Sequence, residues 1–360
     1  MTENLTYKKA GVDYDQQDRI MGNLTYWVTR TFEFQPNTVK LPLGYFANVI
    51  DIGNGLGLAL STDGVGTKIL VAQMMNKYDT VGIDCVAMNV NDVLCVGAKP
   101  IALLDYVAVE APRDDLMGAL IKGLYDGAEQ ARVTIPGGEI AQVREMIRGV
   151  RDKYAFDLVG TCAGTVRLDK ILYGEQTRPG DLIVGLRSTG VHSNGLSLAR
   201  SVLFDRMGWT VDKHVDELGR TIGEELLEPT RIYVQEVLAM LEANLNIKAM
   251  AHITSSGFLN LSRANADVAY VLDQLPEPQP IFRLLQRSGN ITDEEMFFSY
   301  NMGIGFCIVV APEHADTALQ IAKKHGAEAH VIGHIEGSAD REVRIPQYRL
   351  IGRDGIFQRS

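Results

Sequence analysis

The stretch from Leu58 to Lys68, LALSTDGVGTK, is apolar at its start and breaks into an aspartate, two glycines and a lysine. Its first half predicts a β-strand, and its glycines favour a turn in which the backbone can approach a ligand closely. It is not the phosphate-binding loop Gly-x-x-x-x-Gly-Lys-Ser/Thr, because no two glycines have that spacing and Thr67 precedes Lys68. The stretch therefore predicts a strand that ends at a ligand site of another kind.

The size and charge of the chain argue against several classes of function. At 360 residues it is long enough for two domains, each with its own core. Its net charge of 35 − 45 = −10 disfavours nucleic acid and anionic membranes as partners. We therefore expect an anionic substrate to be met locally, by lysine, arginine, a metal ion or backbone N–H groups.

The cysteines and the apolar runs predict a soluble cytoplasmic protein. The four cysteines are far apart in the sequence and three of them lie in apolar runs, so reduced, buried thiols are expected. The N-terminal residues show no apolar signal core, and no apolar run is long enough to span a bilayer.

Two units of mixed strands and helices follow one another along the chain. Residues 80–98 fit a buried helix at least as well as a strand. We expect an α/β or α+β fold with domains at residues 1–168 and 169–345 and a tail at 346–360. The other predicted elements are strands within 55–62, 100–111, 133–139 (entering a glycine turn), 156–166 and 179–190, helices at 114–132, 192–208 and after Pro229, and a strand, helix and strand within 306–335.

Three acidic residues, Asp63, Asp92 and Glu139, stand where apolar runs break. Carboxylates of this kind suit Mg²⁺, which is usually shared with substrate phosphates. Without a cation, gathered carboxylates would repel one another by about 1–4 kcal/mol per close pair. Taken singly, each aspartate is more simply a turn or cap residue; taken together, the three favour a metal site.

Several other polar residues are candidates for anion binding. Lys8 and Lys68 would neutralise phosphate oxygens, and the N–H groups around Gly64 and Gly66 could approach them. His192 lies in a glycine-flanked turn and is equally well a proton-transfer group, a phosphate donor or a surface histidine. His252 could bind an anion with the backbone after it, although a lone histidine is more often structural. Arg231 could reach a phosphate, although a helix-start salt bridge is the simpler interpretation.

Taken together, the motifs resemble one family. The segments YKKAGVD, STDGVGTK, GIDCVAMNVNDVLCVGAKP, LDY, GGE, STGVHSNGLSLAR, EPTRIY, AHIT and NMGIGF follow in this order from about Tyr7 to about Gly333. The chain resembles phosphoribosylformylglycinamidine cyclo-ligase, also called aminoimidazole ribonucleotide synthetase. DGVGTK and VND indicate only the wider superfamily, whereas HSNG, EPTRIY and AHIT point to the cyclo-ligase. Segments such as FDLVGTC and LDQLPEPQPIF resemble its archaeal-type branch.

The resemblance implies a fold and a reaction. The N-terminal domain would form a barrel with a second subunit of a homodimer, and a C-terminal α/β domain would pack beside it. ATP would activate the formyl amide oxygen of formylglycinamidine ribonucleotide. The amidine nitrogen would then close the imidazole ring, releasing ADP and phosphate. Such a site would align donor and acceptor and neutralise charge on the phosphoryl group.

The resemblance also implies roles for particular residues. The expected metal ligands for Mg²⁺ are Asp63, Asp92 and Glu139. The catalytic set is Asp63, Asp92, His192, Lys8 and Lys68; the ATP and phosphate set is Gly64, Gly66, Thr67, Lys68 and Asp105; the substrate set is His252, Thr254, Ser255 and Arg231.

The sequence departs from the family pattern at a few positions. Ile140 and Gln142 stand where bacterial members have threonine and glutamate, Ser255 and Ser256 replace two glycines, and Lys9 replaces a common aspartate. Two rival functions remain open: a small-molecule kinase of the same superfamily with another acceptor, and a catalytically silent binding paralogue.

Overall fold

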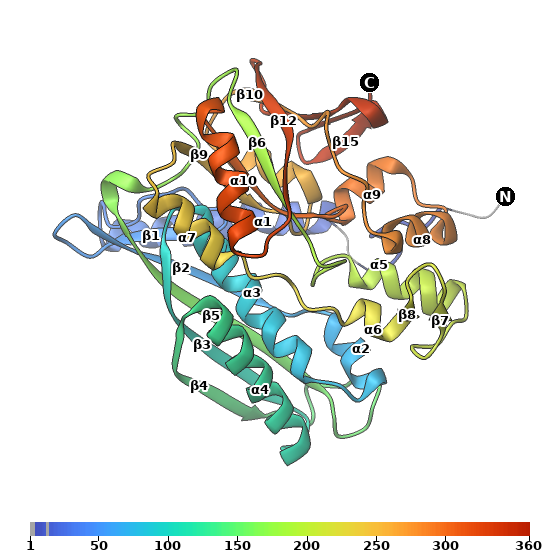
Figure 1. Cartoon of the computed structure of the whole chain (residues 1–360). Helices are drawn as coiled ribbons and strands as arrows, with labels where there is room; N and C mark the ends of the chain where they lie inside the picture. The colour runs from blue at the N-terminus through green and yellow to red at the C-terminus, as the bar shows by residue number, and fades with distance from the viewer. Residues whose placement is uncertain (1–3, 12–13) are drawn as a thin grey trace.

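The computed structural model describes residues 4–11 and 14–360, with only the backbone described for residues 14–19. The fold is built on two mixed β-sheets, with helices between and around them (Figure 1). The first, sheet A, has the spatial order β1 (Asn48–Asp51), β2 (Leu56–Gly64), β5 (Phe156–Arg167), β3 (Lys99–Val109) and β4 (Thr134–Gln142).

Sheet B lies in the C-terminal half and is the larger sheet. Its eight strands run in the order β15 (Ile356–Arg359), β14 (Leu350–Arg353), β13 (Glu342–Ile345), β10 (Val268–Val271), β12 (Ala329–Gly337), β6 (Leu182–Arg187), β11 (Ile304–Val310) and β9 (Ile247–His252). A two-stranded ribbon pairs β7 (His214–Val215) with β8 (Arg220–Thr221).

The α-helices of the described chain are α1 (Tyr14–Arg30), α2 (Lys68–Met75), α3 (Asp79–Cys95), α4 (Asp114–Ala131), α5 (Leu196–Arg200), α6 (Ile222–Leu226), α7 (Val234–Glu242), α8 (Pro280–Gly289), α9 (Asp293–Ser299) and α10 (Ala315–Lys324). A π-helical segment, Ser201–Arg206, continues α5. Five 3₁₀ turns complete the described elements: Thr31–Phe34, Leu168–Lys170, Gly257–Arg263, Pro312–His314 and Pro346–Tyr348.

Helix α3 is the centre of the molecule. It packs on β2, β5 and β3 of sheet A, on β9 of sheet B and on α4, which lies outside it. Buried residues occur all around it, and a helix enclosed in this way has no polar stripe to set its period. For this reason the sequence left residues 80–98 open between helix and strand, and the structure makes them a helix.

Most predicted strands and helices are confirmed, and three expectations are wrong. Residues 133–139 do not enter a glycine turn, because β4 continues through Gly137 and Gly138 to Gln142. Residues 346–360 are not a tail, because β14 and β15 extend sheet B as a hairpin. The sequence pattern predicts no helix in the first forty residues, yet α1 occupies residues 14–30.

The N-terminal segment packs against the C-terminal half. The backbone N–H of Tyr7 donates to Glu295 Oε1 at 2.9 Å, and the Tyr7 hydroxyl accepts from the backbone N–H of Gly195 at 2.7 Å. The expected domain of residues 1–168 is therefore not a separate unit at its start. The last two residues of the YKKAGVD motif, Val12 and Asp13, lie outside the described residues.

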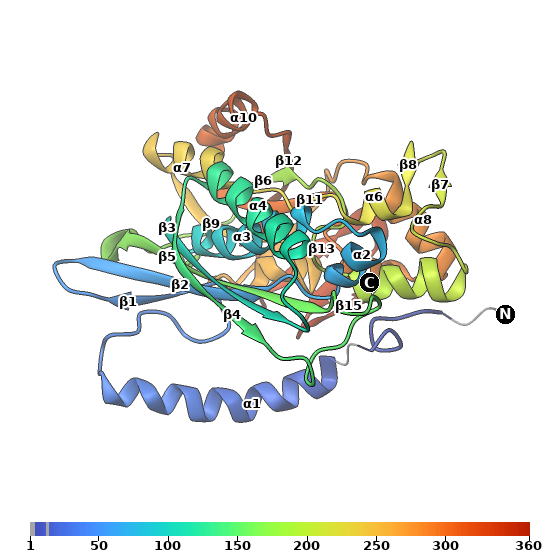
Figure 2. The ribbon, with the colours of Figure 1, turned by 90° about the horizontal axis from the view of Figure 1, so that it is seen from below.

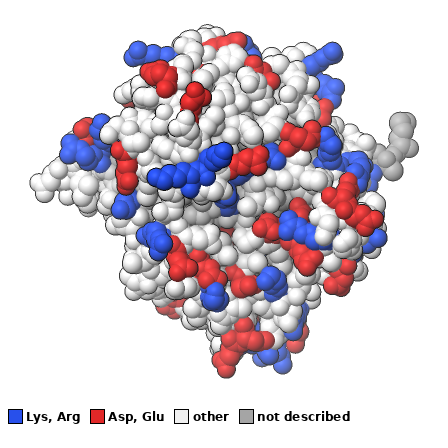
Figure 3. Space-filling model, viewed as in Figure 1, with Lys and Arg blue, Asp and Glu red and all other residues white. Residues whose placement is uncertain are grey.

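The surface is mixed in charge. On the face shown in Figure 3, lysines and arginines are interspersed with aspartates and glutamates. Within the part of the chain that the structure describes, none of the helices combines the length and apolarity that crossing a membrane requires.

The close contact of α3 with α4 predicts opposite effects for two glycine substitutions in α4. A Cβ atom at Gly123 would lie 1.8 Å from the backbone oxygen of Asp79, whereas Gly118 has nothing within 4 Å. We expect Gly123→Ala to destabilise the protein by about 2 kcal/mol or more, because the two backbones must separate. Gly118→Ala should stabilise it by about 0.5–1 kcal/mol through helix propensity. Urea denaturation measures both, and equal effects would contradict the packing.

Candidate active site

Strand register places Asp63 and Asp105 on the face of sheet A that α3 covers. Asp63 pairs with Gly160 of β5, Gly160 pairs with Asp105 of β3, and Asp105 pairs with Gly138 of β4. Paired residues of neighbouring strands point to the same face. The two aspartates therefore stand in one cross-strand row, with a glycine between them.

Asn89 of α3 fills the space above that glycine. A Cβ atom at Gly160 would lie 2.6 Å from Asn89 Nδ2, so a larger residue would displace the amide. The Asn89 amide accepts from the backbone N–H of Asp63 at 2.9 Å and donates to the backbone oxygen of Asp63 at 3.1 Å. These two bonds hold the end of β2 against the helix.

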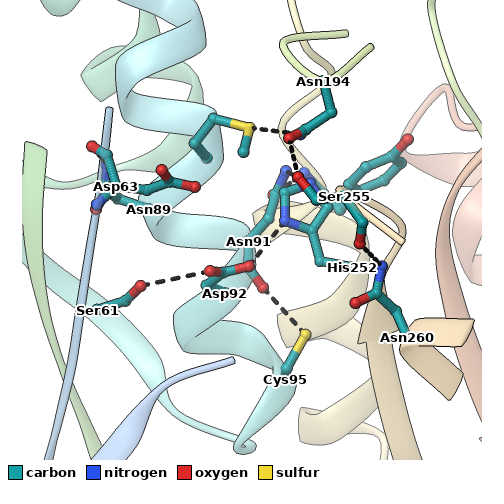
Figure 4. Close-up of polar contacts among 12 residues, drawn as sticks. Ser61, Asp63, Asn89, Asn91, Asp92, Cys95, Asn194, His252, Ser255 and Asn260 are labelled. Atoms are coloured by element: carbon teal, nitrogen blue, oxygen red, sulfur yellow. Dashed lines mark hydrogen bonds and ion pairs between the residues drawn. The ribbon is translucent and has the colours of Figure 1, made fainter. Parts of the chain in front are cut away.

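Asp92 and His252 join the two sheets. His252, at the end of β9 and fully buried, places Nδ1 2.9 Å from Asp92 Oδ1. Asp92 Oδ2 accepts from Ser61 Oγ at 3.5 Å, and Asn91 Nδ2 lies 3.5 Å from His252 Nε2. With a proton on Nδ1, that nitrogen donates to the carboxylate, and Nε2 faces the Asn91 amide. Figure 4 shows Ser61 and Asp63 on one side of α3 and His252 and Ser255 on the other.

Asp63 carries an uncompensated charge. Burial and then the nearby charge of Asp92 raise the pKa of the Asp63 carboxyl to about 6. Its Oδ1 accepts from the backbone N–H of Gly64 at 2.8 Å, which offsets only part of this cost. Two adjacent carboxylates in such surroundings fit a divalent cation, because a cation would relieve both burial and repulsion.

Glu139 does not join these carboxylates. It pairs with Tyr106 of β3, one residue beyond the Asp105–Gly138 pair, so it points to the opposite face of sheet A and is exposed. Among the residues that the structure describes, no group of three His, Cys, Asp or Glu side chains could hold a metal ion. The three-carboxylate set expected from the sequence is therefore not formed within the chain.

Lys68 and Arg231 have other partners than those expected. Lys68 is fully buried; its Nζ lies 2.9 Å from Asp84 Oδ1 and donates to the backbone oxygen of Glu228 at 2.6 Å. The Arg231 guanidinium lies 3.3 Å from Glu236 and lines a separate cavity of about 390 Å³. The structure places neither side chain beside Asp63 and Asp92.

His192 is buried and neutral rather than exposed. Its Nε2 accepts from the backbone N–H groups of Thr189 at 3.1 Å and Arg231 at 3.4 Å. Burial, and then the charge of His252, lower its pKa well below the usual value. Its Nδ1 is buried with no hydrogen-bond partner among the described residues. His192 can therefore offer one neutral N–H donor, and not a positive charge.

The loop after His252 lies against the loop that contains His192. Ser255 Oγ donates to Asn194 Oδ1 at 2.8 Å, and the Ser255 carbonyl accepts from Asn260 Nδ2 at 2.8 Å. Ser256 and Gly257 adopt positive φ values of 69° and 54°. A Cβ atom at Gly257 would meet the Phe297 carbonyl oxygen at 1.9 Å, so this position admits only glycine. Thr254, partly exposed, precedes this turn.

The remaining predicted residues surround the same region. Gly66, with φ of 72°, turns the chain from β2 into α2, after Gly64. Thr67 Oγ1 lies 3.0 Å from Ser197 Oγ. Lys8 is exposed and follows Tyr7, which contacts the 192–195 loop through Gly195.

Asp105 lines a cavity of about 710 Å³ between α4 and the edge of sheet A. Its walls are mainly apolar, and burial raises the pKa of the Asp105 carboxyl. The lining residues are Asp105, Ile121, Leu124, Tyr125, Ala128, Glu129, Arg132, Val133, Thr134 and Ile135. An apolar cavity with a few polar groups suits a planar heterocycle.

Sequence reasoning missed the polar residues of α3 other than Asp92. Asp84, Asn89 and Asn91 lie in an apolar run, and each is buried. The sequence did contain a clue. Buried polar side chains need hydrogen-bond partners, so four polar residues in an otherwise apolar helix indicate contacts between that helix and other segments.

The raised pKa of Asp63 predicts a pH-dependent stabilisation by Asp63→Asn in metal-free buffer. The pKa of the Asp63 carboxyl is about 6 in the folded state and about 3.8 in the unfolded chain. Above pH 6 the ionised carboxylate therefore costs the wild type roughly 3 kcal/mol, and at pH 4 it costs little. Thermal unfolding should show the variant more stable at pH 7.5 and equal to wild type near pH 4.

Asp51→Asn is the matched control. Lys40 lowers the pKa of the Asp51 carboxyl, so removing that carboxylate should lower stability at neutral pH, with the opposite sign. A stability difference for Asp63→Asn that does not change with pH would contradict the electrostatic argument.

Two family models match the chain. The model described as AIR synthase related protein, N-terminal domain, matches residues 44–166, and the C-terminal domain model matches residues 178–346. Proteins named phosphoribosylformylglycinamidine cyclo-ligase are similar over nearly the whole length: 47% identity with that of Methanococcus maripaludis strain C6, covering 93% of each chain, and 46% with that of Methanocaldococcus jannaschii, covering 93% of each. The relative from Methanothermobacter thermautotrophicus is 47% identical over 92% of this chain and 94% of its own.

Solved structures share the fold. PurL of T. maritima, solved in complex with FGAR, is 19% identical with a TM-score of 0.57 over 86% of this chain, which spans about half (47%) of the PurL chain. Thiamine-monophosphate kinase of Stenotrophomonas maltophilia K279a is 18% identical with a TM-score of 0.59, covering 88% of this chain and 94% of its own. At these identities the likeness shows the two-domain α/β fold and no more.

Proposed function

Since the chain belongs to the phosphoribosylformylglycinamidine cyclo-ligase family, we propose that it catalyses ATP-dependent cyclisation of formylglycinamidine ribonucleotide to aminoimidazole ribonucleotide, in purine biosynthesis. One observation carries the proposal to particular residues: Asp63 and Asp92 of the N-terminal half lie together beside His252 of the C-terminal half. A site between two halves can hold two substrates in a fixed mutual orientation.

The reaction requires activation of the formyl amide oxygen, which is a poor leaving group. The γ-phosphoryl group of ATP passes to the formyl amide oxygen, and the amidine nitrogen attacks the same carbon. The phosphorylated oxygen leaves as phosphate, and the nitrogen gives up a proton. Phosphoryl transfer of this kind is governed by alignment and by neutralisation of charge.

Asp63 and Asp92 would hold Mg²⁺. When bound, the ion would neutralise the negative charge on the phosphate oxygens of ATP. The support is that burial, and then the like charge of Asp92, raise the pKa of Asp63, which a bound cation would relieve. Glu139, on the opposite sheet face, has no place in this set within one chain.

Three groups of residues would hold the substrates. The cavity beside Asp105 would receive the adenine of ATP, since its walls are apolar and its carboxyl could accept from the exocyclic amine. The loops that contain His192, Thr254 and Ser255 would hold the ribonucleotide, with the unpartnered His192 Nδ1–H as a donor to an oxygen. Gly64, Gly66, Thr67 and Lys8 would line the phosphate path.

The activity test uses purified protein with ATP, Mg²⁺ and formylglycinamidine ribonucleotide, and follows the aminoimidazole product. Wild type should form the product with one ADP per ring. Asp63→Asn and Asp92→Asn should each lower kcat by about 100-fold or more, because each removes charge that the transition state needs.

Two outcomes would contradict this function. ATP consumption without ring formation would favour the rival kinase, and no ATP binding under any condition would favour a silent paralogue. Near-normal turnover by Asp63→Asn would refute its role while leaving the reaction in place.

We also propose a homodimer in the cytoplasm. Leu104 and Tyr106, on the face of sheet A opposite α3, are 48% and 42% exposed, and Ile20, Leu24 and Trp27 form an exposed apolar stripe on α1. Figures 1 and 2 place α1 on that open side of the sheet. Apolar surfaces of this kind favour a partner, and a second copy could complete a barrel with sheet A. The buried, unpaired cysteines support a reducing compartment.

The dimer predicts that Leu104→Glu yields a monomer. A buried, unpaired carboxylate at the interface would cost enough to lower dimer affinity by at least about 100-fold. Sedimentation equilibrium at micromolar concentration measures it. Ile356→Glu, at an exposed apolar position of β15 (50% exposed), is the control and should stay dimeric. A monomeric wild type would end the proposal.

A further inference from the structure

We propose that Lys68, Asp84 and Asn91 are positioning residues that clamp residues 228–233, here called the inter-domain strap, and thereby hold His192 and His252 in place. Lys68 would then act through the strap and not as a phosphate ligand. The inference rests on the proposed function for its kinetic arm, and on contacts alone for its stability arm.

The strap is irregular chain between α6 and α7, and side chains satisfy its backbone groups. The Glu228 carbonyl accepts from Lys68 Nζ at 2.6 Å, and the Pro229 carbonyl accepts from Thr189 Oγ1 at 2.5 Å. The backbone N–H and the hydroxyl of Thr230 donate to Asp84 Oδ1 at 2.7 Å and 2.6 Å.

The second half of the strap is held in the same way. Asn91 Nδ2 donates to the Arg231 carbonyl at 2.9 Å, and Asn91 Oδ1 accepts from the backbone N–H of Tyr233 at 3.0 Å. The Arg231 N–H donates to His192 Nε2 at 3.4 Å. Irregular chain that is buried must find such partners, and here most of them come from α2 and α3.

The buried ion pair between Lys68 and Asp84 is used in binding the strap. Lys68 and Asp84 are 0% exposed and 2.9 Å apart, and Asp84 Oδ1 receives Lys68 and both Thr230 donors. A lysine so enclosed cannot reach a phosphate without leaving a buried carboxylate unpaired, which is costly. The clamp therefore excludes the phosphate role that the sequence motif suggested.

The clamp connects directly with both histidines. Asp84 and Asn91 are seven residues apart on α3, so they project from one side of the helix two turns apart. The amide of Asn91 contacts the strap and also faces His252 Nε2 at 3.5 Å. A displaced strap would break the Arg231 bond to His192 Nε2 and shift the Asn91 amide, and both histidines would lose part of what orients them.

A charge-balanced double variant tests the clamp. Lys68→Met and Asp84→Asn alone should each lower the Tm by about 5 °C or more and kcat by about 10-fold or more, because each leaves a buried group unpaired. The double variant Lys68→Met/Asp84→Asn removes both charges and keeps an acceptor for Thr230. It should recover only part of the Tm and of kcat, because the buried charges are balanced again while the Lys68–Glu228 bond stays lost, and KM for ATP should stay within about 3-fold of wild type.

The alternative gives a different pattern. If Lys68 binds phosphate, Lys68→Met and the double variant alike raise KM for ATP by 10-fold or more, with no rescue, and the proposal is overturned. Tm losses that simply add in the double variant would overturn it too. A wild type that does not form the aminoimidazole would refute the proposed function, and the Tm cycle would still decide the clamp.

A milder pair of variants covers the case in which Lys68→Met fails to fold. Thr230→Val loses the hydroxyl bond to Asp84 and should lower kcat with KM for ATP unchanged, whereas Thr230→Ser keeps the hydroxyl and should restore kcat. Equal kinetics for the two variants would contradict the clamp.

Discussion

The structure depends on a helix that is buried on all sides and yet carries polar side chains. In α3, Asp84, Asn89 and Asn91 are fully buried and Asp92 is largely so. A buried polar group without a partner costs about 1–3 kcal/mol, and more when it is charged. Each of these groups therefore requires a bond from another part of the chain, and those bonds join the two halves.

The positions of these polar residues around α3 decide which segment each of them binds. Asp84 and Asn91 share one side of α3 and hold the inter-domain strap, whereas Asn89 and Asp92 face β2 and β9. One helix thus fixes the end of β2, the strap and the end of β9 relative to one another. The placement of Asp63 beside Asp92 and His252 follows from this arrangement, because each reaches the site from an element that α3 holds.

Several features could be predicted from the sequence, for clear reasons. Alternation and apolar runs predicted β2, β3 and β5, since these patterns reflect burial on one or both faces. Asp63 and Asp92 were singled out because both stand where apolar runs break, and in the structure the charge of Asp92 adds to burial in raising the pKa of Asp63. The misplaced Glu139 shows where such reasoning fails: strand parity decides the face, and a shift of one residue reverses it. Helix α1 was missed although Ile20, Leu24 and Trp27 have helical spacing, and all three side chains are exposed.

The glycine motif at the end of β2 can now be interpreted. Gly66 takes a positive φ of 72°, which lets the chain reverse from β2 into α2 over a few residues. The reversal leaves Asp63 at the site, where its charge is unfavourable without a cation, and carries Lys68 to Asp84, where its charge is neutralised. The same short motif therefore presents an uncompensated carboxylate to ligands and a compensated lysine to the other half of the protein. On the proposed function, substrate binding and the contact between the two halves therefore depend on the same few residues.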